Sequence, residues 1–170
     1  MKSNSRVQHI LGIYRACAAP LYRVLEVIPD EHLRWKPAPE SRSISEIMRH
    51  LIRVDNWFLG RLGYPPEAVD PKGGTSEDIL HNLKIVQRQI ETILKDCRDD
   101  SELARRSQAP DAGEHETLGE VILHISQHYL YHLAQMVYLR RAQDRNWPAP
   151  LKEWENATHV ISANITKTGG

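Results

Sequence analysis

One stretch, from Thr117 to Arg141, constrains the fold more than any other part of the chain; it reads TLGEVILHISQHYLYHLAQMVYLRR. It opens with a capping box, Thr117-x-x-Glu120, whose two side chains satisfy amides at a helix N-terminus. It closes on Arg140 and Arg141, which carry the charge that a helix C-terminus favours. Between the capping box and these arginines there is no glycine or proline. The stretch therefore predicts one long helix.

One face of this helix carries two histidines within an apolar stripe. At about 100° per residue, six side chains project within roughly 40° of one line; they are Val121, Ile125, His128, His132, Gln135 and Leu139. His128 and His132 are four residues apart, so their imidazoles lie one turn above the other. Because one turn rises about 5.4 Å, both rings can reach a single metal ion, provided that another element supplies a third ligand.

Helix signals recur along the rest of the chain. Two further capping boxes, Ser43-x-x-Glu46 and Thr75-x-x-Asp78, open helical patterns. Pro20 lies inside the first apolar periodic segment, where it predicts a kink or a broken turn. The prolines of residues 35–39 exclude helix from that connector. The helices expected from these signals span residues 3–28, 43 to Gly60 or Gly63, 75–97, 117–141 and, as a short closing helix, 151–165.

Four long helices without a convincing strand predict an all-α fold, an up-down four-helix bundle with a short C-terminal extra helix. The 170 residues suffice for one domain with a full-sized core, so residues 1–170 are expected to form a single domain. The loops are longer than bundle geometry requires. Long loops at one end of a bundle often build a functional site.

Composition excludes several classes of function. The chain has 22 basic and 22 acidic residues and no long run of either sign, so nothing in it indicates nucleic-acid or anionic-membrane binding. No apolar run approaches the roughly 20 residues that a membrane span needs, and the N-terminus shows no signal pattern. Cys17 and Cys97 form no CxxC motif and are interpreted as reduced packing residues. We therefore expect a cytoplasmic protein.

His50, on the second expected helix, is the candidate third ligand. It lies about 120° from the most apolar line of that helix, so it belongs to a second buried face or to its edge. A site of three histidines with an open coordination position is typical of catalytic rather than structural zinc. The alternative is that each histidine is a core residue with one hydrogen bond, and spacing alone leaves both interpretations open.

Three neighbouring polar residues have open roles. His124 extends the His128 and His132 ladder toward the edge of the stripe, where it could be a ligand, a partner of a ligand or a surface group. Gln135, one turn beyond His132, could orient a ligand or form a buried amide contact between helices. Asp55, on the apolar line of the second helix, could support a histidine or accept a proton, or could pair with an arginine of a neighbouring helix.

The ordered combination of three short motifs resembles the DinB-like family of metal-binding four-helix bundles, over about Val7 to Arg141. The motifs are LRWKPAP at 33–39 leading into SISEI at 43–47, HL at 50–51 followed by DNWFL at 55–59, and HISQH at 124–128 followed by YHLAQ at 131–135. The family often has a glycine before the glutamine, where this chain has Ala134. This small change is expected to leave the ligands undisturbed.

The resemblance implies that His50, His128 and His132 bind one divalent metal ion, zinc or nickel in most relatives. It also implies either of two kinds of metal-dependent enzyme. Some relatives resemble hydrolases, and others resemble transferases of low-molecular-weight thiols. The expected partners are therefore a small-molecule substrate or thiol, and relatives are often homodimers. The alternative function is a non-catalytic stress-response protein, a bundle that binds a metal or ligand or only dimerises.

Overall fold

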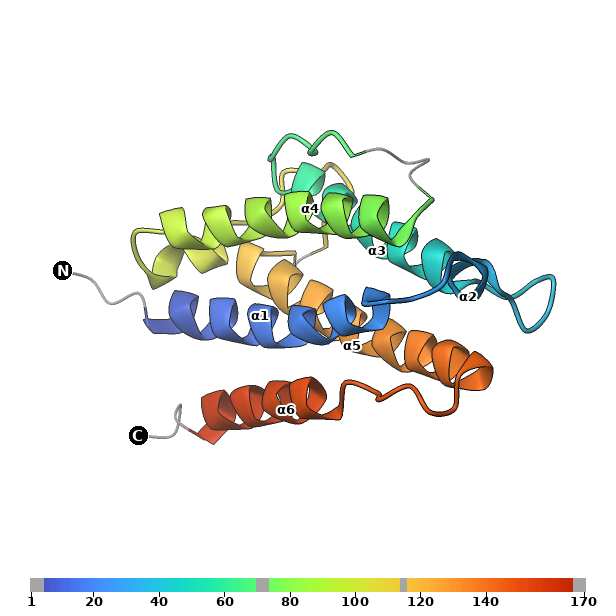
Figure 1. The fold of residues 1–170 in the computed structure, drawn as a ribbon. Coiled ribbons are helices and arrows are strands. Elements are labelled where there is room, and N and C mark those ends of the chain that lie inside the picture. Colours follow the sequence, from blue (N-terminus) through green and yellow to red (C-terminus); the bar gives the residue numbers. More distant parts are fainter. Residues whose placement is uncertain (1–4, 70–73, 114–115, 167–170) are drawn as a thin grey trace.

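The computed structural model describes residues 5–69, 74–113 and 116–166 (Figure 1). Within these ranges every regular element is a helix, and the connectors between the helices contain one isolated bridge, between Arg106 and Thr117. The all-α fold class is therefore confirmed. The elements are α1 (Ser5–Leu25), α2 (Asp30–Arg34), α3 (Ile44–Arg61), α4 (Ser76–Asp96), the short 3-10 helix η1 (Asp100–Ala104), α5 (Leu118–Gln143) and α6 (Leu151–Thr166).

Three capping boxes set the starts of α3, α4 and α5. At Ser43, Thr75 and Thr117 the hydroxyl accepts a hydrogen bond from the backbone amide three residues on, and the acidic side chain there accepts one from the amide of the cap residue. The predicted starts are confirmed because the signal is local to four residues. The end of α3 at Arg61 also lies where it was expected.

The first helix departs from its prediction at Pro20. Helix α1 runs without interruption from Ser5 to Leu25 and buries Pro20 in the core. Of the predicted kink or broken turn, the broken turn was therefore wrong, because burial of the surrounding apolar face outweighs the loss of one amide donor. Helix α1 ends before Val27, whose φ of 49° is left-handed. The expected start at Ser3 lies outside the described residues.

Helices α1, α3, α4 and α5 form the bundle. Helix α1 packs against α4 and α5, and α3 packs against the same two helices. Helices α3 and α5 run antiparallel, since His50 near the start of α3 meets His132, whereas Arg61 at its end meets Glu116, just before α5. Helix α1 runs parallel to α5 and α4 runs parallel to α3, as Figure 1 shows. Along the chain the order of directions is therefore up, down, down, up.

This order of directions explains the long connections of the bundle. Parallel neighbours cannot be joined by a tight turn, because the chain must return along the helix that it has just left. Residues 62–75 make this return between the end of α3 and the start of α4. The connector between α1 and α3 holds the single turn of α2 and the proline-rich residues 35–39, which are not helical, as predicted.

Helix α6 lies outside the four-helix bundle, along α1 (Figure 1). Ala157 of α6 packs on Ala16 and Cys17 of α1 in a small cluster, whereas the bundle helices share one large apolar core. The expected closing helix is therefore confirmed. Cys17 and Cys97 are both buried and unpaired.

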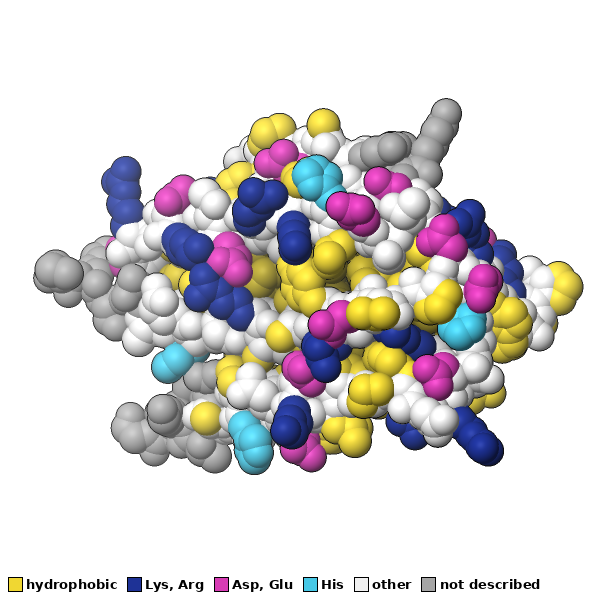
Figure 2. All heavy atoms as spheres, viewed as in Figure 1, with side chains coloured by type: hydrophobic (Ala, Val, Ile, Leu, Met, Phe, Trp, Pro, Cys, Tyr) yellow, Lys and Arg dark blue, Asp and Glu magenta, His cyan; other side chains and the backbone are white. Residues whose placement is uncertain are grey.

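Charged side chains of both signs are interspersed over the face seen in Figure 2. This agrees with the balanced composition of 22 basic and 22 acidic residues. Among the described residues, every helix is too short or too polar to cross a lipid bilayer.

Candidate metal centre

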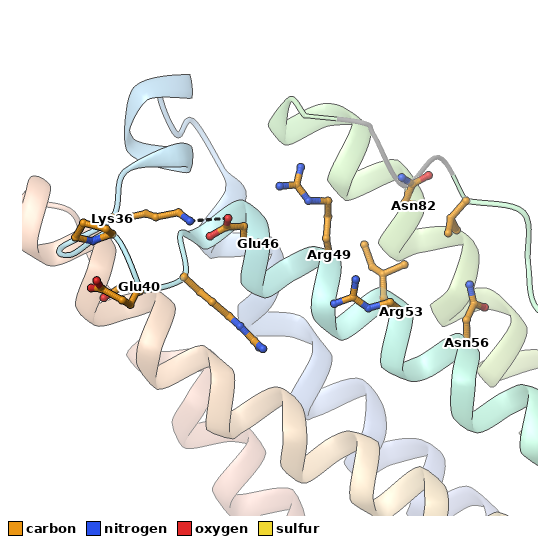
Figure 3. A pocket seen from close by; sticks show the side chains of 12 residues that line it. Lys36, Glu40, Glu46, Arg49, Arg53, Asn56 and Asn82 are labelled. Atoms are coloured by element: carbon orange, nitrogen blue, oxygen red, sulfur yellow. Dashed lines mark ion pairs between the residues drawn. The ribbon is translucent and has the colours of Figure 1, made fainter.

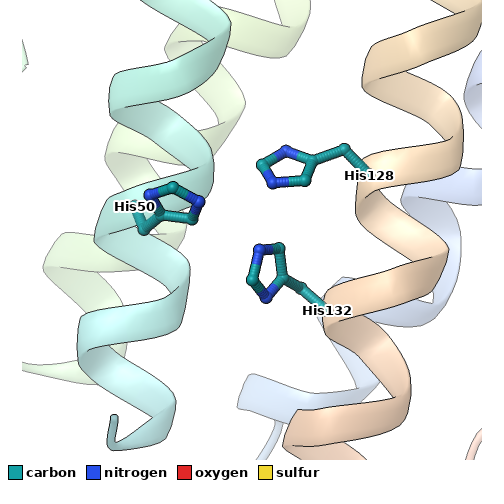
Figure 4. A group of neighbouring side chains, drawn as sticks. All are labelled: His50, His128 and His132. Carbon is teal, nitrogen blue, oxygen red and sulfur yellow. The ribbon is translucent and has the colours of Figure 1, made fainter.

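Three histidines from two antiparallel helices meet in the structure (Figure 4). His50 projects from α3 toward α5, and His128 and His132 project from successive turns of α5 toward α3. One nitrogen of each ring can be chosen so that the three nitrogens lie within 4.8 Å of one another. The helix periodicity of α5 places the second and third histidines on one face. The antiparallel packing of α3 brings the first to the same level.

The three rings lie slightly farther apart than the rings of histidines that bind one metal ion. Their centroids are 5.2 Å apart for His50 and His128, 5.0 Å for His50 and His132, and 4.5 Å for His128 and His132. Nitrogens that bind zinc tetrahedrally at about 2.1 Å lie roughly 3.4 Å from each other. The ring nitrogens, which lie within 4.8 Å of one another, would therefore have to approach by about 1 Å to bind one ion.

The donor set of the cluster fits a divalent metal ion. Three imidazoles provide the nitrogen donors that zinc and nickel accept. The ring nitrogen of His128 that faces the other two rings is Nε2, the one remote from the backbone (Figure 4). Its Nδ1 atom is buried without a hydrogen-bond partner among the described residues, and an ion bound to Nε2 would leave Nδ1 unchanged.

Gln135 fixes the orientation of His132. The Nδ1 atom of His132 lies 2.8 Å from the Oε1 atom of Gln135, one turn further along α5. An amide oxygen can only accept, so the Nδ1–H of His132 donates this bond and the Nε2 atom keeps its lone pair. Metal-binding histidines commonly have such a partner on the second nitrogen. Of the two roles left open for Gln135, the structure supports the one that orients a ligand.

The surroundings keep all three rings neutral at neutral pH. Burial lowers the pKa of His128 to about 4, with further contributions from the two neighbouring histidines of the cluster. Burial is also the main cause that lowers the pKa of His50 and of His132, and the charge of Arg42 lowers both further. Because only a neutral imidazole binds a metal, protons compete weakly for these ligands.

The cluster lies on the wall of an open pocket of about 930 Å³. Polar side chains on the pocket wall include Arg42 from the connector before α3 and Tyr131 and Tyr138 from α5. The two tyrosines are 63% and 69% exposed, so they can contact a molecule that enters from solvent. Helix periodicity carries no signal for Arg42, because Arg42 lies in the connector before α3. Tyr131 and Tyr138 lie three and ten residues after His128, a helical spacing that could have identified them.

His124 is not part of the cluster. Its side chain is exposed, and its ring lies 5.0 Å from that of Phe58 and 6.2 Å from that of His128, between centroids. Of the three roles left open for it, the structure therefore supports a surface group at the edge of the site.

Asp55 lies away from the histidines and has a different partner from the arginine that was considered. It is fully buried and accepts a hydrogen bond from the hydroxyl of Tyr129. The hydroxyl of Tyr129 lies 3.4 Å from that of Tyr14. Burial raises the pKa of Asp55 to about 8, and the bond from Tyr129 lowers it only in part. Asp55 therefore belongs to the core between α1, α3 and α5, and not to the pocket.

A comparison with known protein families covers the part of the chain that contains the cluster. A family model described as the DinB superfamily matches residues 13–136, which include all three histidines of the cluster and Gln135. No curated protein and no solved structure matches the chain.

Proposed function

The chain belongs to the DinB superfamily, and from that premise we propose that it is a divalent-metal-dependent enzyme, either a hydrolase or a transferase of low-molecular-weight thiols. In this proposal His50, His128 and His132 hold a zinc or nickel ion and leave part of its coordination sphere open. One observation carries the proposal: three neutral imidazoles from two helices converge on the wall of an open pocket.

The chemistry that such an ion supplies is the activation of water or a thiol, whose pKa falls toward neutrality when it is bound. A free thiol has a pKa of about 8.5 and bulk water about 15.7, so a thiol needs the smaller shift. Thiol transfer therefore demands less of the surrounding side chains than hydrolysis does.

The side chains of this site have two tasks in the proposed reaction. Gln135 holds His132 in the tautomer that presents Nε2 to the ion. Arg42 lies close enough to lower the pKa values of His50 and His132, so its positive charge also acts on a substrate in the pocket. A fixed cation of this kind stabilises negative charge that develops on a substrate oxygen or on a leaving group.

The first experiment measures metal content. The full chain, purified without an affinity tag and without chelator, is analysed by plasma mass spectrometry beside the variants His50→Ala, His128→Ala and His132→Ala. We expect about one zinc or nickel ion per chain in the wild type and almost none in the variants. His124→Ala is the matched control, because His124 shares the ladder on α5 but not the cluster. Equal metal content in the wild type and in all three cluster variants would refute the site.

The second experiment separates an enzyme from a binding protein. Wild type and His132→Ala are assayed for thiol conjugation to electrophiles and for hydrolysis of esters and amides, with and without added zinc or nickel. A metal-dependent rate that His132→Ala abolishes supports the proposal. If the loaded wild type and the metal-free variant give the same rate over the whole panel, the metal site is not catalytic, and the protein is a binder.

A further inference from the structure

A second pocket, of about 550 Å³, lies beside the metal centre (Figure 3). Ser41 and Arg42 line both pockets, so the two are neighbours around the connector that leads into α3. The second pocket lies where α3 and α4 run parallel. Side chains from the first three turns of these helices, Arg49 and Arg53 of α3 and Asn82 of α4, contribute to its wall.

The wall of this second pocket is positively charged. It carries four cationic side chains and two acidic ones; they are Lys36, Arg42, Arg49 and Arg53 against Glu40 and Glu46. The Nζ atom of Lys36 lies 2.7 Å from a carboxylate oxygen of Glu46, so this pair neutralises itself. The remaining charge is that of three arginines against one glutamate, in a protein whose overall charge is balanced.

Arg49 and Arg53 have no hydrogen-bond or ion-pair partner for their guanidinium groups within residues 5–69, 74–113 and 116–166. They are four residues apart and project from α3 one turn from each other, as Figure 3 shows. Like charges at this spacing destabilise a helix slightly, so the pair does not serve the stability of α3. Arg61 on the same helix differs, because it is bonded to both Glu116 and Asp111.

Two consecutive residues of helix α3 line the two different pockets. Arg49 and His50 are consecutive, and a step of about 100° around the helix points them toward different neighbours. His50 faces α5 and the other two histidines, whereas Arg49 lines the pocket against α4. A small molecule that extends around Ser41 and Arg42 can therefore contact the histidines and the two arginines at once.

We propose that Arg49 and Arg53 bind an acidic group, a carboxylate or a phosphate, of a small-molecule substrate whose reacting group lies at the three histidines. The planar guanidinium fork matches the oxygen pairs of both groups, and charge-assisted bonds of this type are among the strongest hydrogen bonds in proteins. Arg42, shared by the two pockets, lies between the acidic group and the reacting group. The part of this inference that concerns the reacting group rests on the proposed function.

The test measures binding of two probes, inorganic phosphate and succinate, to the full chain as purified, by isothermal titration calorimetry at low ionic strength. We expect the wild type to bind at least one probe at one site per chain. In Arg49→Gln/Arg53→Gln the affinity should fall roughly tenfold or more, because two charge-assisted bonds are lost. Arg98→Gln/Arg145→Gln is the matched control, since it removes the same charge from exposed positions outside the pocket.

Two further comparisons make the result decisive. The variant Arg49→Lys/Arg53→Lys keeps the positive charge but loses the planar guanidinium groups. It should therefore bind the probe with an affinity between those of the wild type and the double glutamine variant. Binding of phosphate alone or of succinate alone identifies which acid the pocket recognises. The proposal is overturned if the wild type binds neither probe, or if the double glutamine variant binds as tightly as the control.

Metal content separates this inference from the proposed function. The double glutamine variant should hold as much metal as the wild type, because both arginines lie outside the histidine cluster. If the wild type holds no metal and the glutamine variant still loses the probe, the proposed function fails and the anion site stands. If the metal is present and the probe binding does not change, the anion site fails alone.

Discussion

Two polar groups lie between α3 and α5, one turn or so apart, and they differ in how their polar atoms are satisfied. In the core, hydroxyl protons join Tyr14, Tyr129 and the Oδ2 atom of Asp55, whereas the Oδ1 atom of Asp55 is buried without a hydrogen-bond partner. At the pocket, no hydrogen bond within the described residues joins His50, His128 and His132 to one another, although one nitrogen of each ring lies within 4.8 Å of the others. The first group is joined by protons, whereas the second offers nitrogen donors that a cation can join.

This difference separates a structural polar cluster from a functional one. A buried group of side chains that hydrogen-bond to one another contributes to the specificity of the fold. Ring nitrogens that converge at an open pocket are accessible to a cation from solvent, and the binding of that cation stabilises the folded chain. The comparison predicts that changes in one group alter metal binding, and that changes in the other alter stability.

The largest effect is expected for His128→Ala. Loss of one of three ligands should weaken metal binding by more than about 100-fold, since loss of a supporting contact alone costs about 10–100-fold. The free energy of unfolding of the metal-free chain should change by less than about 1 kcal/mol, because lost packing is offset by removal of an unsatisfied nitrogen. Competition with a chelator measures the affinity, and urea unfolding measures the stability. If His128→Ala is strongly destabilised and still binds the metal, then His128 has a structural role and not a metal-binding one.

A smaller effect on the same group is expected for Gln135→Leu. This change removes the acceptor that fixes Nδ1–H of His132 and should weaken metal binding by about 10–100-fold. Gln135→Glu is the matched control, since a carboxylate at the same position still accepts the bond and should keep or raise the affinity. Equal affinities in the leucine and glutamate variants would show that His132 is oriented by packing alone.

The sequence predicted the features of this site that depend on local pattern. The capping boxes at Ser43, Thr75 and Thr117 fix helix starts within four residues, and the spacing of His128 and His132 follows from helix periodicity. His50 is on another helix, so its place beside the other two depended on the resemblance to a family. The structure brings it there by antiparallel packing of α3 and α5.

Long-range contacts could not be predicted in the same way. Arg140 was expected to complement the dipole of its own helix, but its guanidinium donates to backbone carbonyls at the end of α1, including that of Val24. The bond of Tyr129 to Asp55 joins residues 74 positions apart. Pairs of this kind depend on which helices are neighbours and in which direction they run. Local sequence patterns do not predict the order of helix directions, up, down, down, up.

The third prediction uses pH to compare the two groups in the metal-free chain. The pKa of Asp55 is about 8 in the folded state, well above the 3.8 of an ordinary aspartate, so the folded chain binds more protons between these values and stability falls as pH rises. The histidines act in the opposite sense, because their pKa values are lowered in the folded state. As pH rises from about 4 to 6.5, they add stability. The unfolded histidines lose their remaining protons just above pH 6.5, so the two contributions overlap there, and comparison with Asp55→Asn isolates the contribution of Asp55.

From pH 6.5 to 8 the free energy of unfolding of the wild type, relative to that of Asp55→Asn, should therefore fall by roughly 1.5 kcal/mol, at a slope of at most about 1.4 kcal/mol per pH unit. Asp55→Asn cannot ionise and should remove this slope, whatever its effect on absolute stability. Urea unfolding at four pH values across the interval measures both chains. Parallel curves for the wild type and Asp55→Asn would mean that Asp55 is already ionised at neutral pH and that the core cluster is not held together by its proton.

The smallest effect is expected at the outer end of the core cluster, for Tyr14→Phe. The hydroxyl of Tyr14 lies 3.4 Å from that of Tyr129, which is long for a bond between two hydroxyls, so its loss should cost less than about 1 kcal/mol. The bond from Tyr129 to Asp55 remains, and Phe fills almost the same volume. Metal content should not change, because Tyr14 belongs to the core group and not to the histidine cluster. A loss of metal in Tyr14→Phe, measured on the same preparations, would show that the two groups act as one network and that the distinction between them is wrong.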